Sequence, residues 1–248
     1  MRRRSLDLFS MAVMFGLVSA AAGQNDNPSK KSLADLQGTW KLTSLEREGE
    51  VREFADRAPR WVVKGDKVLY GGEELATLVP GPATTPKSLD LAFRTPKPDK
   101  EAIYSLTDDT WKICMNWLAD GAKERPLEFS TKDKPNLRVL IFQRVKGKEA
   151  DDPASGSGFA GIAIRRDEND ALFVNDVFEG SPAKKAGLAK DDQILKIGGA
   201  DPGSLQDFVK TVQQARPDSE LVIRVERDGK EKDIKVKVGL MPFHFLLN

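Results

Sequence analysis

The chain has 248 residues, of which 40% are hydrophobic, 31% are charged and 7% are aromatic. This length suits one large domain or two small ones. The charged fraction excludes a chain embedded mainly in lipid, and the hydrophobic fraction excludes wholesale disorder. Lys and Arg number 39 and Asp and Glu number 38, so the chain lacks the excess positive charge that binds nucleic acid. We therefore expect no nucleic-acid partner.

Cysteine and histidine are scarce, with one of each at Cys114 and His244. One cysteine cannot form an internal disulfide, and the two residues are too few for a Cys/His zinc site. We expect neither a metal nor a cofactor. Cys114 lies among alternating apolar residues with no histidine near it in sequence, which favours a buried small side chain over a nucleophile.

The N-terminus has the composition of an export signal. Three arginines at positions 2–4 precede an apolar stretch, Leu8–Val18, and small residues follow it, with Ala20-x-Ala22 as the expected cleavage pattern. The apolar stretch is shorter than the ~20 residues that a membrane-spanning helix needs. We expect removal of residues 1–23 and a periplasmic or secreted protein with no stable membrane span.

Two segments of distinct composition divide the rest of the chain. Residues 24–32 are polar and expected to be disordered, and residues 146–157 are charged and then Gly/Ser-rich, as linkers are. They delimit two predicted domains, 33–145 and 158–239, followed by an apolar C-terminal tail, residues 240–248.

The first predicted domain contains eight short segments rich in β-branched and aromatic residues, separated by turn residues. The segments are Thr39–Leu45, Trp61–Lys64, Lys67–Tyr70, Glu74–Val79, Ser88–Phe93, Ala102–Thr107, Thr110–Met115 and Leu137–Arg144. Eight strands at this spacing predict an eight-stranded up-and-down β-barrel, and thus a mainly β fold class.

A Gly-x-Trp string at 38–40 opens the first of these segments, and Arg144 lies in the last. In a small barrel such a tryptophan closes one end, and the arginine lies across its ring by a cation–π contact. Together with the longer strings Leu36–Glu50 and Trp61–Val68, this pattern resembles the lipocalin-like domain of exported planctomycete proteins.

The lipocalin-like resemblance implies a barrel that acts as a scaffold or contains a small apolar ligand. The candidate contacts for such a ligand are Trp40, Trp111 and Arg144. The alternative is that the aromatic residues only fill the core, because an eight-stranded barrel is only just wide enough for a cavity.

The second predicted domain contains two sequence strings that together resemble a known domain family. GSPAKKAGL at 180–188, followed by DDQILKIGG at 191–199, resembles the most recognisable stretch of PDZ domains of the bacterial secreted form. Asp191 stands where the family usually has glycine, and Gly198 where asparagine is common. The resemblance implies a β-sandwich or partly open barrel with two helices, the second of them over residues 205–214.

The PDZ resemblance also implies peptide binding by addition of a strand to a sheet edge. Phe159, Ala160, Gly161 and Ile162 match the carboxylate-binding loop, in which the glycine lets successive N–H groups point at one spot. The edge strand would come from the residues that follow this loop. These residues are Ile162, Ala163 and Ile164.

The helix over residues 205–214 would form the other wall of the peptide groove. Leu205 and Val209 share one helical face, and Phe208 and Val212 share another. We predict the first pair for the groove and the second for the core; alternatively all four only pack the helix. The apolar lining predicts a peptide or protein C-terminus with an apolar last residue as partner.

The C-terminal tail is more apolar than chain ends usually are. We expect it to fold back onto a domain or to join the two domains, with insertion into a PDZ groove as the alternative. The chain has no Gly-x-Ser-x-Gly string, and its one histidine lies in this tail.

These features predict a non-catalytic exported protein, not an enzyme, in which the PDZ domain binds peptides or protein C-termini and the barrel is a scaffold. One alternative is a carrier of a small apolar ligand in the barrel. Another is a regulatory partner of an exported protease, which would make that protease a further binding partner.

Overall fold

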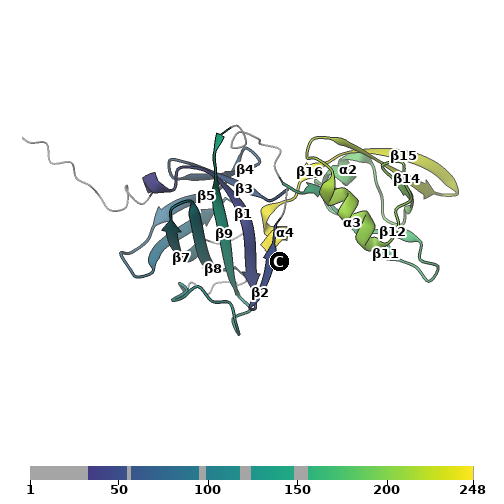
Figure 1. The fold of residues 1–248 in the computed structure, drawn as a ribbon. Coiled ribbons are helices and arrows are strands. Elements are labelled where there is room, and N and C mark those ends of the chain that lie inside the picture. The colour runs from purple at the N-terminus through teal and green to yellow at the C-terminus, as the bar shows by residue number, and fades with distance from the viewer. Residues whose placement is uncertain (1–32, 55–56, 95–98, 118–123, 148–155, 248) are drawn as a thin grey trace, which may run out of the picture.

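The computed structural model describes residues 33–54, 57–94, 99–117, 124–147 and 156–247. These residues form two β-rich bodies with the C-terminal tail between them (Figure 1). The expected signal peptide, the expected disordered segment after it and most of the expected linker lie outside the described residues. The described residues contain no helix long and apolar enough to cross a membrane.

The first body is a closed eight-stranded barrel, as predicted (Figure 1). Successive strands pair antiparallel in chain order, and the last strand returns to the first, where Arg144 lies opposite Trp40. The barrel strands are β1 (Gly38–Arg47), β3 (Arg60–Lys64), β4 (Lys67–Tyr70), β5 (Glu73–Pro80), β6 (Lys87–Phe93), β7 (Lys100–Thr107), β8 (Thr110–Asn116) and β9 (Leu137–Val145).

One strand of the first body is absent from the prediction. Strand β2 (Glu50–Glu53) pairs with the second half of β1 through a tight turn at Glu48-Gly49. All four of its residues are exposed, so its sequence has no alternation of apolar and polar positions to mark it as a strand.

Large aromatic side chains fill the barrel interior. Trp40, Trp61 and Trp111 are fully buried, and their rings meet edge to face at 5.4 and 5.8 Å between centroids. Phe142 on β9 lies 4.6 Å from Trp61. Rings of this size bury the largest apolar area per residue, so this cluster accounts for much of the stability of the barrel.

The second body combines a five-stranded antiparallel sheet with two helices (Figure 1). The strands follow chain order, so β11 is one edge of the sheet. The elements are β11 (Ile162–Arg166), β12 (Leu172–Val177), α2 (Pro182–Ala186), β13 (Gln193–Ile197), α3 (Leu205–Gln214), β14 (Glu220–Arg227) and β15 (Lys230–Lys237). A separate two-stranded ladder joins β10 (Gly158–Phe159) to β16 (Gly239–Leu240).

Helix α3 begins with a capping box. Ser204 accepts a hydrogen bond from the N–H of Asp207, whose carboxylate accepts one from the N–H of Ser204. This exchange satisfies two backbone donors that a helix start leaves free. The helix then buries Phe208 and Val212 in the core of the second body, as predicted for this pair.

The C-terminal tail folds back onto the barrel. Its helix α4 (Phe243–Leu247) buries three apolar side chains, Phe243, Leu246 and Leu247, within the barrel core. Arg138 on β9 is itself buried and donates from Nε to the carbonyl of Leu247 at 2.7 Å. The tail therefore docks on a domain, and the alternative prediction, insertion of this segment into a PDZ groove, is wrong.

Candidate peptide-binding site

The predicted carboxylate-binding loop, Phe159–Ile162, connects the short strand β10 to the edge strand β11. Gly161 has φ +77°, a left-handed conformation that residues with a Cβ rarely adopt. A Cβ at this position would lie 2.3 Å from the Cβ of Ser181. Glycine is therefore required here both by the backbone conformation and by the close approach of the turn before α2.

Two hydrogen bonds set the orientation of the loop. The N–H of Ala183 donates to the carbonyl of Ala160 at 2.9 Å, and the N–H of Phe178 donates to the carbonyl of Gly161 at 3.0 Å. Across a planar trans peptide the C=O and the following N–H point in opposite directions. The N–H groups of Gly161 and Ile162 thus point away from the groups that bind these carbonyls.

Strand β11 has an open edge. Its described pairing is with β12, where Ile162 lies opposite Val177. The bond from the Phe178 N–H to the Gly161 carbonyl shows that Ile162 and Val177 are a non-hydrogen-bonded pair. The N–H and C=O of Ile162 therefore point away from β12, toward the side on which an added strand would pair.

Side chains from β11 and α3 supply apolar surface near this edge. Ile162 and Ile164 alternate with Ala163 and share one face of the strand, and both are partly buried against the core of the second body. On α3, Leu205 is partly buried and Val209 is 41% exposed. These are the faces predicted for the groove, and their role in binding stays a prediction.

The remaining loop residues differ in what they offer. Ala160 is buried in the core, so only its backbone is available to a ligand. Phe159 is half-buried, and its ring lies 5.4 Å from that of Phe245 in the tail. Sequence reasoning missed Ser181 and Phe178 as neighbours of Gly161. The string at 180–188 signals the family without showing that Ser181 contacts the loop, and Phe178 has no motif around it.

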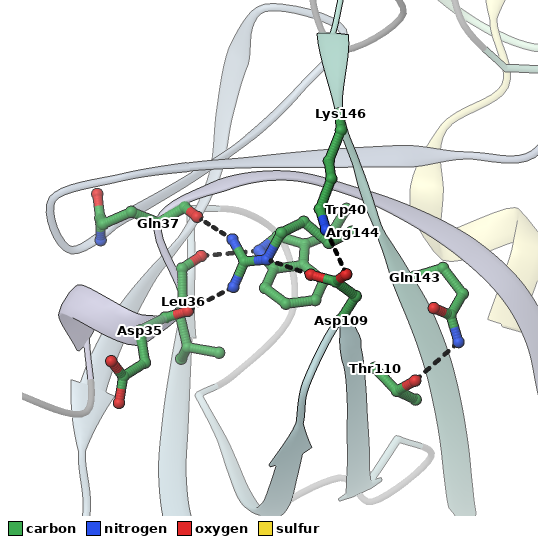
Figure 2. A network of polar contacts seen from close by, with 9 residues as sticks. All are labelled: Asp35, Leu36, Gln37, Trp40, Asp109, Thr110, Gln143, Arg144 and Lys146. Carbon is green, nitrogen blue, oxygen red and sulfur yellow. Dashed lines mark hydrogen bonds and ion pairs between the residues drawn. The ribbon is translucent and has the colours of Figure 1, made fainter.

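The residues predicted to contact a small ligand pack at one end of the barrel. Figure 2 shows Arg144 above the ring of Trp40, with its guanidinium carbon 4.1 Å from the ring centroid, which confirms the predicted cation–π contact. Arg144 also donates to the carbonyls of Asp35 and Gln37 at 2.6 and 2.5 Å. Trp40 and Trp111 are fully buried. Their role in ligand binding stays a prediction.

A cavity of about 190 Å³ lies where the tail enters the barrel. Aromatic rings of the barrel and the tail line it, together with two apolar residues, Leu75 and Pro242, and with Glu73, Glu74 and His244. The described residues that line it include no serine or cysteine. Burial raises the pKa of the Tyr70 hydroxyl on its wall, so this side chain stays neutral.

Cys114 on β8 is fully buried, as predicted. Burial raises the pKa of its thiol to about 12, with the charge of Glu46 adding to the effect. Because the thiolate is the reactive form, we expect Cys114 of the folded protein to resist Ellman's reagent at pH 8. The same thiol should react within minutes in 6 M guanidinium chloride. Fast, stoichiometric labelling of the folded protein would contradict this placement.

Comparison with known proteins identifies the second body. Residues 151–238 match the PDZ domain family. This segment is a PDZ domain. The chain is 20% identical to the HtrA3 PDZ domain bound to a phage-derived ligand (FGRWV), with a TM-score of 0.30 over 33% of this chain and 84% of that one.

Two curated relatives are named as proteases. A probable periplasmic serine endoprotease, DegP-like, of Chlamydia pneumoniae is 42% identical over 70 residues, which are 28% of this chain and 14% of the relative. A probable CtpA-like serine protease of Staphylococcus aureus (strain MRSA252) is 34% identical over 140 residues, which are 55% of this chain and 27% of the relative. The chain thus spans only a minor part of the length of either relative.

The predicted class of protein is wrong. We expected a non-catalytic exported protein, with a small-ligand carrier or a regulatory partner of a protease as alternatives, and the relatives named as serine proteases contradict this. The expectation depended on one histidine and a missing Gly-x-Ser-x-Gly string. Serine nucleophiles are also activated by lysine, so neither feature excludes serine-protease chemistry.

Proposed function

We propose that this protein acts in proteolysis of the serine-protease type, and that its PDZ domain binds a protein substrate through an extended segment with a free C-terminal carboxylate. The observation that carries the proposal is the open edge of β11, where the N–H and C=O of Ile162 point outward directly after Gly161. The protease names of the relatives support the proteolytic setting.

In the proposed complex the substrate adds one strand to the sheet beside β11. The backbone of Ile162 pairs with the substrate backbone, as in other β-augmentation complexes. The terminal carboxylate binds the outward N–H groups of Gly161 and Ile162, which attract an anion without a cationic side chain. The last side chain then contacts Phe159, Ile162 and Ile164 on one side and Val209 on the other, so an apolar residue is preferred.

The predicted location and domain organisation belong to the same proposal. We propose export after removal of residues 1–23, with domains at 33–145 and 158–239; the word periplasmic in the name of a relative supports this location. We also propose a lipocalin-like identity for the barrel. The Gly-x-Trp string at the start of β1 and the stacking of Arg144 on Trp40 support that identity.

Calorimetric titration of the full chain with short peptides tests the binding step. We expect peptides ending in Val, Leu or Ile as free acids to bind at least about tenfold more tightly than the same peptides as C-terminal amides, because the amide removes the charge that the loop recognises. Peptides ending in Asp or Lys should bind as weakly as the amides. Equal binding of all peptides, or no binding, would contradict the proposal.

A fluorescent casein assay with the full chain tests the proteolytic step. The expected result is casein cleavage that a serine-directed covalent inhibitor abolishes. A saturating concentration of an apolar-ended peptide should change the rate of this cleavage. Cleavage no faster than with a heat-inactivated sample would contradict the proteolytic part and leave the binding part standing.

A further inference from the structure

The tail contacts the carboxylate-binding loop as well as the barrel. Phe245 is 41% exposed, on the side of α4 that faces away from the barrel core. Its ring stacks on Phe178 with centroids 5.9 Å apart and planes 6° apart, and lies 5.4 Å from the ring of Phe159. Phe159 begins the loop, and the N–H of Phe178 binds the carbonyl of Gly161. Phe245 therefore contacts the first residue of the loop and one of the two residues whose N–H groups bind loop carbonyls.

The barrel holds this phenylalanine in place. Phe243, Leu246 and Leu247 on the same short helix are buried in the barrel core. Before the helix, the hydroxyl of Tyr70 on β4 donates to the carbonyl of Met241 at 2.7 Å. Because the backbone of α4 is anchored at both ends, the helix cannot move away from the loop without disturbing barrel contacts.

Backbone pairing and a backbone hydrogen bond also connect the start of the loop to the tail. Phe159 on β10 lies opposite Gly239 on β16. The N–H of Met241 donates to the carbonyl of Ser157 at 2.9 Å. The side chain of Leu240 fills the space beside Gly156, where an added Cβ would lie 2.4 Å from it. One continuous tail thus connects the barrel core to the first residue of the loop.

The position of Phe245 favours support of the loop over blockage of the groove. Phe178 directly follows β12, and β12 lies on the side of β11 opposite the open edge. A ring stacked on Phe178 is therefore on the β12 side of the loop, opposite the edge at which an added strand would pair. The contact can stabilise the bound conformation of the loop while the backbone edge of β11 stays open to a peptide.

We propose that Phe245 is a positioning residue for the carboxylate-binding loop, and that docking of the tail in the barrel preorganises the PDZ domain for peptide. This inference rests on the proposed function. A loop held in its binding conformation loses less conformational freedom when the peptide arrives, so affinity rises. Linkage is reciprocal, so bound peptide should also stabilise the docked tail.

Peptide affinity of Phe245 variants tests the inference. We expect Phe245→Ala to raise the Kd of an apolar-ended peptide about fivefold, because two ring contacts are lost. Phe245→Tyr keeps the ring and should restore the wild-type Kd. Phe129→Ala removes another half-buried ring, which contacts Lys112 on the barrel, and is the control that should leave the Kd unchanged.

Hydrogen exchange without peptide provides a second readout. The N–H groups of Phe178 and Ala183 donate into the loop, so their exchange rates report its order. We expect both to exchange faster in Phe245→Ala and at the wild-type rate in Phe245→Tyr and Phe129→Ala. Faster exchange with no peptide binding in any variant would support the positioning contact and reject the proposed function. Unchanged exchange, or an unchanged Kd where the wild type binds, would overturn the inference.

Discussion

Replacing Phe243 with alanine is expected to lower the free energy of unfolding of the barrel by about 3 to 5 kcal/mol. The ring is 3% exposed, and its centroid lies 5.0 Å from that of Trp61 and 5.7 Å from that of Tyr70. Truncation removes the apolar contact and leaves a cavity among rigid rings that cannot collapse into it. Urea unfolding followed by tryptophan fluorescence measures the loss.

Two controls accompany the Phe243 variant. Val79→Ala truncates a side chain that is 45% exposed on β5, and should change the free energy of unfolding by no more than about 0.5 kcal/mol. Phe243→Leu keeps most of the apolar volume and should have an intermediate effect. A loss for Phe243→Ala as small as that for Val79→Ala would show that the tail is not part of the barrel core.

Replacing Gly161 with alanine is expected to raise the Kd of an apolar-ended peptide at least about thirtyfold. The left-handed backbone costs an alanine about 1–2 kcal/mol, and its Cβ would lie 2.3 Å from the Cβ of Ser181. The loop can relieve this contact only by moving, which turns the N–H groups of Gly161 and Ile162 away from a bound carboxylate. Calorimetric titration gives the Kd, and circular dichroism checks that the domain still folds.

The chain contains a matched control for the Gly161 variant. Gly180 has φ +71°, but a Cβ added there has no atom within 4 Å. Gly180→Ala thus carries a similar backbone cost without the clash, and should leave the Kd within about twofold of the wild type. If Gly161→Ala binds like the wild type, or if both variants lose affinity equally, the loop is not the carboxylate site.

The two glycine variants and the Phe245 variants separate two properties of the same loop. Gly161 sets the local conformation that exposes the N–H groups, whereas Phe245 supplies support from outside the domain. A large effect at Gly161 with none at Phe245 would describe a PDZ domain that works independently of the barrel.

Local patterns in the sequence determined most of the secondary structure. The eight predicted barrel strands are present with ends shifted by no more than two residues, because each has an apolar face or turn residues that mark it. Strand β2 was missed since all of its residues are exposed. In the PDZ segment, the family resemblance placed helix α3, and the spacing of its apolar residues placed its buried face correctly.

The sequence by itself therefore determined the barrel strands, the PDZ domain and the loop that contains Gly161, because each is marked by residues close together in the chain. For closure of the barrel, the Gly-x-Trp string and Arg144 indicated that the first and last strands meet. Only the tertiary structure decided where the tail goes. Its apolar composition predicted burial, but the sequence does not say which apolar surface has room for Phe243. Contacts between Phe245 and residues more than 60 positions earlier likewise depend on how two domains meet, and no local pattern encodes them.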